Sequence, residues 1–223
     1  MYYLLVPIIY LGFVYTINKN KSYLQRYNYD NFKTIYNYIM IFISFMNVIL
    51  SLLSNYQDNK LNNIYNMMCI PYHINNVYMR YNILLFLFSK IFEWCDTFFL
   101  IMYNKPLIFL HLFHHSSTFF LTFLLSYPIS AIYFIPCFLN SVVHFIMYSY
   151  YQFKFMRPFK FIITKLQILQ HFLVLLSSIY LLIQNYYNIY CFNNMTSIYI
   201  GIFCYFSYFI LFISFYLKNK TIS

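Results

Sequence analysis

Three histidines stand close together in the middle of the chain, at a spacing that supports chemistry. His111, His114 and His115 follow the pattern i, i+3, i+4, so a helix would carry them on one face. Neutral imidazoles bind iron or zinc, and they also act as nucleophiles and bases toward thioesters. The cluster therefore predicts either a metal centre or a site of acyl transfer.

Three other apolar segments carry polar residues at helical spacings of their own. In the segment before the histidines, Lys90, Glu93 and Thr97 share a face, which Asp96 borders. After the histidines, two further faces carry imidazole, amide, hydroxyl and phenol groups. They are Asn140, His144, Tyr148 and Tyr151 on the first, and Thr164, Gln167 and His171, with Gln170 beside them, on the second. Ionisable groups are expensive in an apolar environment, so their presence there indicates function.

The composition predicts what kind of elements hold these residues. Of the 223 residues, 62% are hydrophobic and 8% are charged, and the mean hydropathy is +0.61. A soluble domain needs roughly a quarter charged residues, so we expect a membrane protein with several spans. The net charge of +10 does not indicate nucleic acid as a partner. The basic residues sit mostly at the ends of apolar runs, where they orient helices and meet anionic groups.

Seven apolar stretches are long enough, or nearly so, to cross a bilayer core of about 30 Å as helices. Backbone hydrogen bonds must close inside each stretch, which a helix achieves. The expected spans are 2–17, 34–54, 80–103, 106–127, 128–151, 161–184 and 196–217. The first is short, but it lacks the basic start and the cleavage site of a signal peptide, so we count it as a span. Residues 1–223 are thus expected to form one all-α transmembrane domain.

Lysine and arginine are distributed unevenly between the connecting segments. Segments 18–33, 104–105 and 152–160 and the tail after Leu217 carry most of them, whereas the opposite set carries Lys60, with Arg80 at a helix edge. By the positive-inside rule the first set is cytosolic. The N-terminus is therefore expected in the lumen and the C-terminus in the cytosol.

This orientation also sorts the cysteines. Cys69 lies in the 55–79 loop and Cys191 in the 185–195 loop, so both face the oxidising lumen and are candidates for a disulfide. Cys95, Cys137 and Cys204 lie within spans and are expected to be packing residues.

The polar faces of four helices come to one depth in this arrangement. At a rise of about 1.5 Å per residue, most of their groups lie roughly 8 to 16 Å from the cytosolic helix ends. Single residues such as Gln170 have the alternative role of bridging helices. Three histidines on one face, beside two carboxylates at similar depth, instead indicate a buried polar site that opens toward the cytosol.

The number of histidines bears on the choice between metal and acyl transfer. Membrane desaturases hold two irons with about eight histidines in several boxes, whereas this chain has one box and single histidines elsewhere. A mononuclear metal stays open as the minority reading. Burial favours a neutral, nucleophilic imidazole, and exclusion of water would protect an acyl-imidazole. A transporter or receptor, whose buried charges line a pathway, is the alternative outside enzymes.

Four motifs in this order resemble one known family. They are KxxExxDT from Lys90 to Thr97, HxxHH from His111 to His115, NxxxHxxMYxYY from Asn140 to Tyr151, and TxxQxxQ from Thr164 to Gln170. Together they resemble the ELO family of fatty acid elongases across about residues 85–172. Tyr208 to Tyr216 also looks like the last helix of that family.

The resemblance implies a very-long-chain 3-oxoacyl-CoA synthase of the endoplasmic reticulum, an acyltransferase that condenses acyl-CoA with malonyl-CoA and releases CoA and CO2. It implies that six of the seven helices enclose an apolar tunnel for the acyl chain. His114 would be the acylated residue, with His111, His115 and His144 as base or orienting groups. Residues implied to bind the substrates are Lys90, Glu93, Asp96, Asn140, Tyr148, Tyr151, Gln167 and Gln170. The resemblance implies no metal or other cofactor.

The resemblance also implies partners, namely the lipid bilayer and the reductase and dehydratase of the elongation cycle. His171 follows Gln170 where an apolar residue is usual, so its role stays open. Acyl-chain length, saturation preference and oligomeric state are not readable from the residues.

Overall fold

The computed structural model describes residues 5–126 and 130–220, and within them every regular element is helical. The first predicted span begins at residue 2, the fourth ends at residue 127 and the fifth begins at residue 128, and these three boundaries lie outside the described residues. The α-helices are α1 (Val6–Lys19), α2 (Lys21–Leu24), α3 (Asp30–Gln57), α4 (Ile64–Cys69), α5 (Val77–Phe92), α6 (Trp94–Met102), α7 (Phe109–Ser126), α8 (Phe134–Gln152), α9 (Lys160–Tyr186) and α10 (Met195–Lys220). Short 3-10 helices occupy Lys60–Asn62, Ala131–Tyr133 and Lys154–Phe159.

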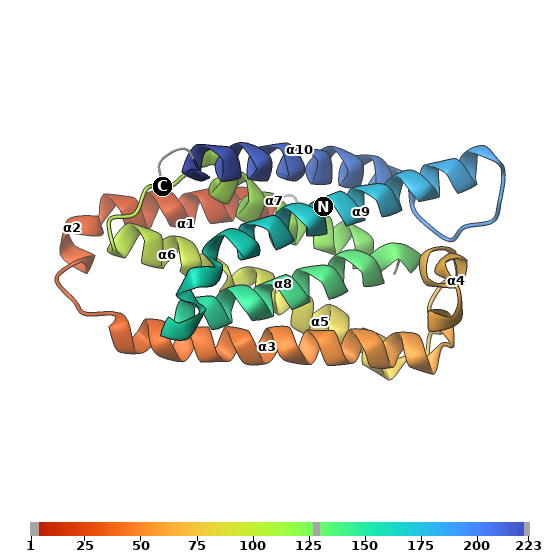
Figure 1. Ribbon diagram of the computed structural model, residues 1–223, viewed down its shortest axis with the longest axis horizontal. Coiled ribbons are helices and arrows are strands. Elements are labelled where there is room, and N and C mark those ends of the chain that lie inside the picture. Colours follow the sequence, from red (N-terminus) through yellow and green to blue (C-terminus); the bar gives the residue numbers. More distant parts are fainter. Residues whose placement is uncertain (1–4, 127–129, 221–223) are drawn as a thin grey trace.

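The long helices run side by side along the longest axis of the molecule (Figure 1). Helix α3 packs against α5 and α8, α8 against α9, α9 against α10, α10 against α7, and α7 against α5. These six helices form a closed ring, in which α3 and α10 lie on opposite sides. Helix α1 packs against α7 and α6 outside this ring.

The connecting segments gather at the two ends of the bundle. One end, called here the α2 end, holds α2, the turn before α7, the Lys154–Phe159 segment and the end of α10; the other, called the α4 end, holds α4 and the α9–α10 loop (Figure 1). Gln25 Nε2 donates to the carbonyls of Ile101 and Met102, each at 3.1 Å, and so ties α2 to α6. The lysine-rich and lysine-poor segments of the sequence thus lie at opposite ends.

The third predicted span, 80–103, is two helices and not one. Glu93 ends α5 and precedes α6, with φ −58° and ψ −17°. The Asp96 N–H donates to the Glu93 carbonyl three residues back at 3.1 Å, so the first turn of α6 is tightened to the 3-10 type. A buried ion pair holds the Glu93 side chain inside the ring at the same point, as described below. The break therefore lies inside the KxxExxDT motif.

Four helical segments are long and apolar enough to cross a membrane, among the residues described: Asp30–Gln57, Ala131–Gln152, Lys154–Tyr186 and Met195–Lys220. Helices α1, α5 and α6 have 14, 16 and 9 residues and are shorter than these. Large apolar side chains are exposed on the outside of the bundle, such as Phe42, Phe88 and Phe203. An apolar outer surface fits a lipid solvent and not water. The chain is therefore a multi-pass membrane protein.

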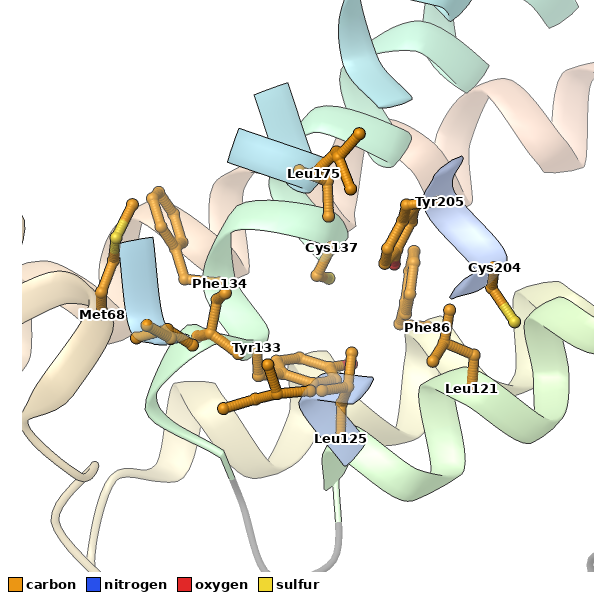
Figure 2. Packing of buried hydrophobic residues seen from close by; sticks show 14 of the residues in the cluster. Met68, Phe86, Leu121, Leu125, Tyr133, Phe134, Cys137, Leu175, Cys204 and Tyr205 are labelled. Carbon is orange, nitrogen blue, oxygen red and sulfur yellow. The ribbon is translucent and has the colours of Figure 1, made fainter. Parts of the chain in front are cut away.

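The apolar core fills the ring toward the α4 end. Figure 2 shows side chains from α4, α5, α7, α8, α9 and α10 and from the 3-10 helix Ala131–Tyr133 meeting there, among them Phe86, Leu125, Tyr133 and Tyr205. They are aliphatic or aromatic and are almost fully buried. This apolar cluster thus lies beyond the polar groups of the α2 end. Buried polar side chains of α3 and α5 also reach it from one side, since Ser51 and Asn82 both contact Cys137.

A covalent link closes the α4 end. Cys69, the last residue of α4, forms a disulfide with Cys191, which lies in the loop between α9 and α10. The backbone adds a second link beside it, because the Phe192 N–H donates to the Cys69 carbonyl at 2.8 Å. The two cysteines joined are the pair that the luminal loops predicted. Cys95, Cys137 and Cys204 are free and lie within helices.

Candidate active site

The three histidines of α7 lie in its first two turns, near the α2 end, and they face two different ways. The rings of His111 and His115 are 4.3 Å apart, as expected for i and i+4 on one helical face. His111 Nε2 is hydrogen-bonded to Thr97 Oγ1 at 2.8 Å, so this contact fixes the orientation of the imidazole. His115 Nδ1 lies 4.0 Å from Glu93 Oε2. This pair therefore faces the KxxExxDT motif.

His114 faces the opposite wall of the ring. Its imidazole packs against two rings of α10, Tyr208 and Phe212, with 4.8 Å and 6.1 Å between ring centroids. The ring of His171 on α9 lies 5.7 Å away, again between centroids. Its Nδ1 is buried and has no hydrogen-bond partner. His114 is thus surrounded by the aromatic rings of α9 and α10, whereas His111 and His115 face the KxxExxDT motif.

Glu93 is the centre of the polar cluster. Its Oε1 lies 2.6 Å from Lys90 Nζ and 3.2 Å from His144 Nδ1. Lys90 also donates to Asn140 Oδ1 at 2.5 Å, which joins α5 to α8. The Lys90 and Glu93 side chains are 2% and 1% exposed, so each charge depends on the other for compensation. Four residues from two of the predicted faces therefore meet at one point.

Asp96 belongs to a neighbouring hydrogen-bonded group. Tyr148 donates its hydroxyl to Asp96 Oδ2 at 2.6 Å. The Tyr148 hydroxyl also lies 3.2 Å from the hydroxyl of Tyr36, a residue of α3 that the motifs did not indicate. The ring of Tyr148 is 5.7 Å from the ring of His144. The Asp96 group thus borders the Glu93 cluster.

Tyr10 is a second site residue that the sequence analysis missed. Its hydroxyl lies 2.8 Å from Thr97 Oγ1, which in turn is bonded to His111. The Tyr10 side chain is fully buried, although α1 lies outside the ring. One tyrosine among 28 in the chain carries no distinguishing pattern, so its place follows only from the packing of α1.

A cavity of about 410 Å³ opens inside the ring between the polar layer and the apolar core. Its polar wall contains Lys90, His114, Asn140, Gln170 and His171. Its far wall contains apolar and aromatic side chains, among them Phe86, Leu121, Leu125, Pro136 and Tyr205. A second cavity of about 260 Å³ lies toward the α4 end and shares Leu125, Pro136 and Tyr205 with the first. The cavity therefore joins a polar wall that contains His114 to an apolar wall.

Two predicted substrate residues belong neither to this cavity wall nor to the Glu93 cluster or the Asp96 group. The Tyr151 side chain is 49% exposed, because it stands in the last turn of α8. Gln167 is half-buried, and its Nε2 lies 3.6 Å from Met147 Sδ. The remaining predicted residues lie in the cavity wall, the Glu93 cluster or the Asp96 group.

The metal alternative requires several donors around one point. In the part of the chain that the structure describes, no three His, Cys, Asp or Glu side chains are grouped to hold one metal ion. Each histidine of α7 has a different main neighbour: Thr97 for His111, Tyr208 for His114 and Glu93 for His115.

A family model matches this chain over almost its whole length, and known proteins match about two thirds of it. Residues 1–221 match the ELO family, described as the GNS1/SUR4 family. Fatty acid elongase 3 of Trypanosoma cruzi is 36% identical over 143 residues, which are 60% of this chain and 47% of that protein. Very long chain fatty acid elongase 3 of Homo sapiens is 34% identical over 161 residues, which are 68% of this chain and 57% of that protein.

The matched region covers about half the length of these relatives, 47% and 57% in the two cases. Within this chain, the family match includes all four motifs, and most of their polar side chains, although not Tyr151 and Gln167, lie around Glu93 and His114. The chain therefore belongs to the ELO (GNS1/SUR4) family of fatty acid elongases.

Proposed function

We propose that the protein condenses a long-chain acyl-CoA with malonyl-CoA and forms a 3-oxoacyl-CoA two carbons longer, with His114 as the acylated residue. The observation that carries this choice is the position of His114. It lines the larger cavity, whereas His111 and His115 do not. The apolar wall beyond it suits an acyl chain. The names of the relatives, which are fatty acid elongases and very long chain fatty acid elongases, support the substrate class.

The first half-reaction transfers the acyl group to the protein. A ring nitrogen of His114 attacks the thioester carbon, the carbon–sulfur bond breaks, and the imidazole proton leaves with the thiolate as the thiol of CoA. His144, held by Glu93 at 3.2 Å, and the His111–His115 pair act as orienting groups and carry protons. Lys90 and Asn140, on the cavity wall, hold the thioester or malonyl group.

The second half-reaction uses malonyl-CoA. Loss of CO2 leaves a carbanion, as the enolate, which attacks the acyl carbon and displaces His114. The displaced imidazole regains its proton from the Glu93 cluster, which in turn takes one from the cytosol. The products are the 3-oxoacyl-CoA and CO2, and free His114 is ready for the next cycle.

The proposal extends to the membrane arrangement. Helices α1, α5–α6 and α7 cross the bilayer with the four long spans, so seven spans place the N-terminus in the lumen of the endoplasmic reticulum. The basic α2 end then faces the cytosol, where Lys and Arg meet the phosphates of CoA. The ring of six helices and its two cavities enclose the acyl chain. The reductase and dehydratase of the elongation cycle take up the product.

The decisive experiment incubates purified protein with acyl-CoA alone and then digests it. Mass spectrometry should find one acyl adduct on the peptide that carries residues 111–115, and His114→Ala should abolish it. His73, exposed near the α4 end, offers a matched control, since His73→Ala should keep the adduct. A folded wild-type protein with no adduct and no malonyl-dependent elongation would refute the proposal, as would stoichiometric iron or zinc bound by the histidines.

A further inference from the structure

One histidine of the cavity wall has no role in the proposed reaction so far. His171 lies on α9 and is 2% exposed. Its ring sits among Tyr205, Tyr208 and Phe212, at 6.2, 5.2 and 5.0 Å between ring centroids. The imidazole is therefore held on several sides by aromatic rings and borders the same cavity as His114.

His171 and His114 are neighbours from different helices. Their ring centroids are 5.7 Å apart and the rings are nearly perpendicular, at 72°. The Nδ1 atom of each ring is buried without a hydrogen-bond partner. Buried polar atoms are normally satisfied, so two orphaned nitrogens on one cavity wall require an explanation. A ligand that enters the cavity and accepts or donates hydrogen bonds there provides one.

Other polar groups also border His114 on this wall, and one of them, the Thr118 hydroxyl one turn along α7, likewise lacks a hydrogen-bond partner. The Tyr208 ring lies 4.8 Å from the His114 ring between centroids, and its hydroxyl is bonded to Ser117 Oγ at 2.6 Å. Lys90 Nζ donates to Glu93 and Asn140, which leaves one of its three N–H groups for the thioester or malonyl group. His171 thus combines proximity to His114 with a ring nitrogen that is still unpaired.

We propose that His171 is a catalytic residue that donates an N–H hydrogen bond to the acyl carbonyl oxygen while His114 attacks. This inference rests on the proposed acyl-histidine pathway. A neutral imidazole carries one N–H donor and one acceptor nitrogen. As the bond from His114 to the acyl carbon forms, the carbonyl electron pair moves to oxygen, and it returns to expel the thiolate. A donor fixed in a water-poor cavity stabilises the charge on that oxygen.

The test compares two substitutions at one position. His171→Phe removes the donor and keeps a flat ring of similar size in an aromatic setting. His171→Gln restores an N–H donor. In single-turnover mixing with acyl-CoA, the rate of adduct formation on His114 should fall about 100-fold or more in His171→Phe. It should recover to within about 10-fold of wild type in His171→Gln, with little change in the acyl-CoA concentration for half-maximal rate.

Phe172→Leu is the matched control, because Phe172 is the next residue of α9 and is 39% exposed. It should keep the wild-type rate. A folded His171→Phe protein that acylates His114 at the wild-type rate would overturn the donor role and leave the acyl-histidine pathway intact. His171→Gln as slow as His171→Phe would also overturn it. Absence of the adduct in wild-type protein would instead refute the pathway itself, and the donor role with it.

Discussion

The carboxylate of Glu93 lies 3.2 Å from Nδ1 of His144, and this contact joins the KxxExxDT motif to the NxxxHxxMYxYY motif. Lys90 lies 2.6 Å from the same carboxylate oxygen. One buried carboxylate thus compensates an ammonium group and orients an imidazole. Burying two charges is costly, and the loss of one partner costs more than the pair itself contributes.

We predict that Glu93→Gln strongly destabilises the protein, because it leaves the Lys90 charge buried without its counter-charge. The expected loss is about 3–5 kcal/mol of unfolding free energy, measured by thermal denaturation in detergent micelles. The double variant Lys90→Met/Glu93→Leu removes both charges and should melt above Glu93→Gln, although it should not elongate acyl-CoA. A double variant that melts at or below the single one would show that the charge pair does not explain the effect.

A second prediction concerns the hydrogen bonds from Tyr10 through Thr97 to His111, each 2.8 Å long. Thr97→Val keeps the shape but removes both bonds, so kcat for elongation should fall about 10-fold, the equivalent of one or two such bonds. Thr97→Ser keeps the hydroxyl and should stay near wild type. The KM for acyl-CoA should change little, because His111 is not among the described residues that line the cavity.

Tyr10→Phe tests the outer link of the same chain of bonds. It should lower kcat a few-fold, whereas Tyr15→Phe on the same helix, 69% exposed, should have no effect. If Tyr10→Phe and Thr97→Val both turn over at the wild-type rate, the chain of bonds does not position His111.

Periodicity predicted the layer of polar groups but not the direction of each side chain. Lys90, Glu93, Asn140 and His144 meet because residues three and four apart share a helical face. The same rule puts His114 beside His111 and His115, yet its ring faces α9 and α10. The spacing i, i+3, i+4 covers a wide arc of the helix, and the neighbours on each side decide where each ring points.

Two further features depended on packing that no motif describes. Tyr10 and Tyr36 complete hydrogen-bonded groups from α1 and α3. The α1 segment has no polar pattern, whereas α3 carries a buried polar face at helical spacing next to Tyr36, namely Asn37, Ser44, Asn47, Ser51 and Ser54, which could have drawn attention to that helix. Glu93 divides the third predicted span because its inward ion pair and its tightened turn occur at one residue. The pairing of Cys69 with Cys191, in contrast, followed from charge distribution alone, since that distribution placed both loops on one side.

The disulfide should contribute to stability at the α4 end. It joins residues separated by 122 positions, so its loss enlarges the conformational freedom of the unfolded chain. We expect Cys69→Ser/Cys191→Ser to lose about 2–5 kcal/mol of unfolding free energy, measured by denaturation under non-reducing conditions. Added reductant should lower the melting temperature of wild-type protein and leave that of the variant unchanged. Equal responses of the two proteins would contradict a stabilising role.

The last prediction concerns the length of the acyl chain. Leu125 is 6% exposed and lies on the walls of both cavities, so under the proposed function we expect its side chain to limit how far an acyl chain reaches toward the α4 end. Leu125→Ala should connect the two cavities and lengthen the longest product by at least one two-carbon cycle. Gas chromatography of the released fatty acids measures the product length. Leu125→Phe should shorten the longest product.

The test uses the distribution of product lengths and not the total rate of elongation. The reason is that Leu125→Ala leaves a cavity that costs about 2–5 kcal/mol of stability, which lowers the amount of folded enzyme. Leu176→Ala, at a position 45% exposed on α9, should leave the distribution unchanged. An unchanged product length in both Leu125 variants would rule out this residue as the limit, because the two substitutions alter the space in opposite directions.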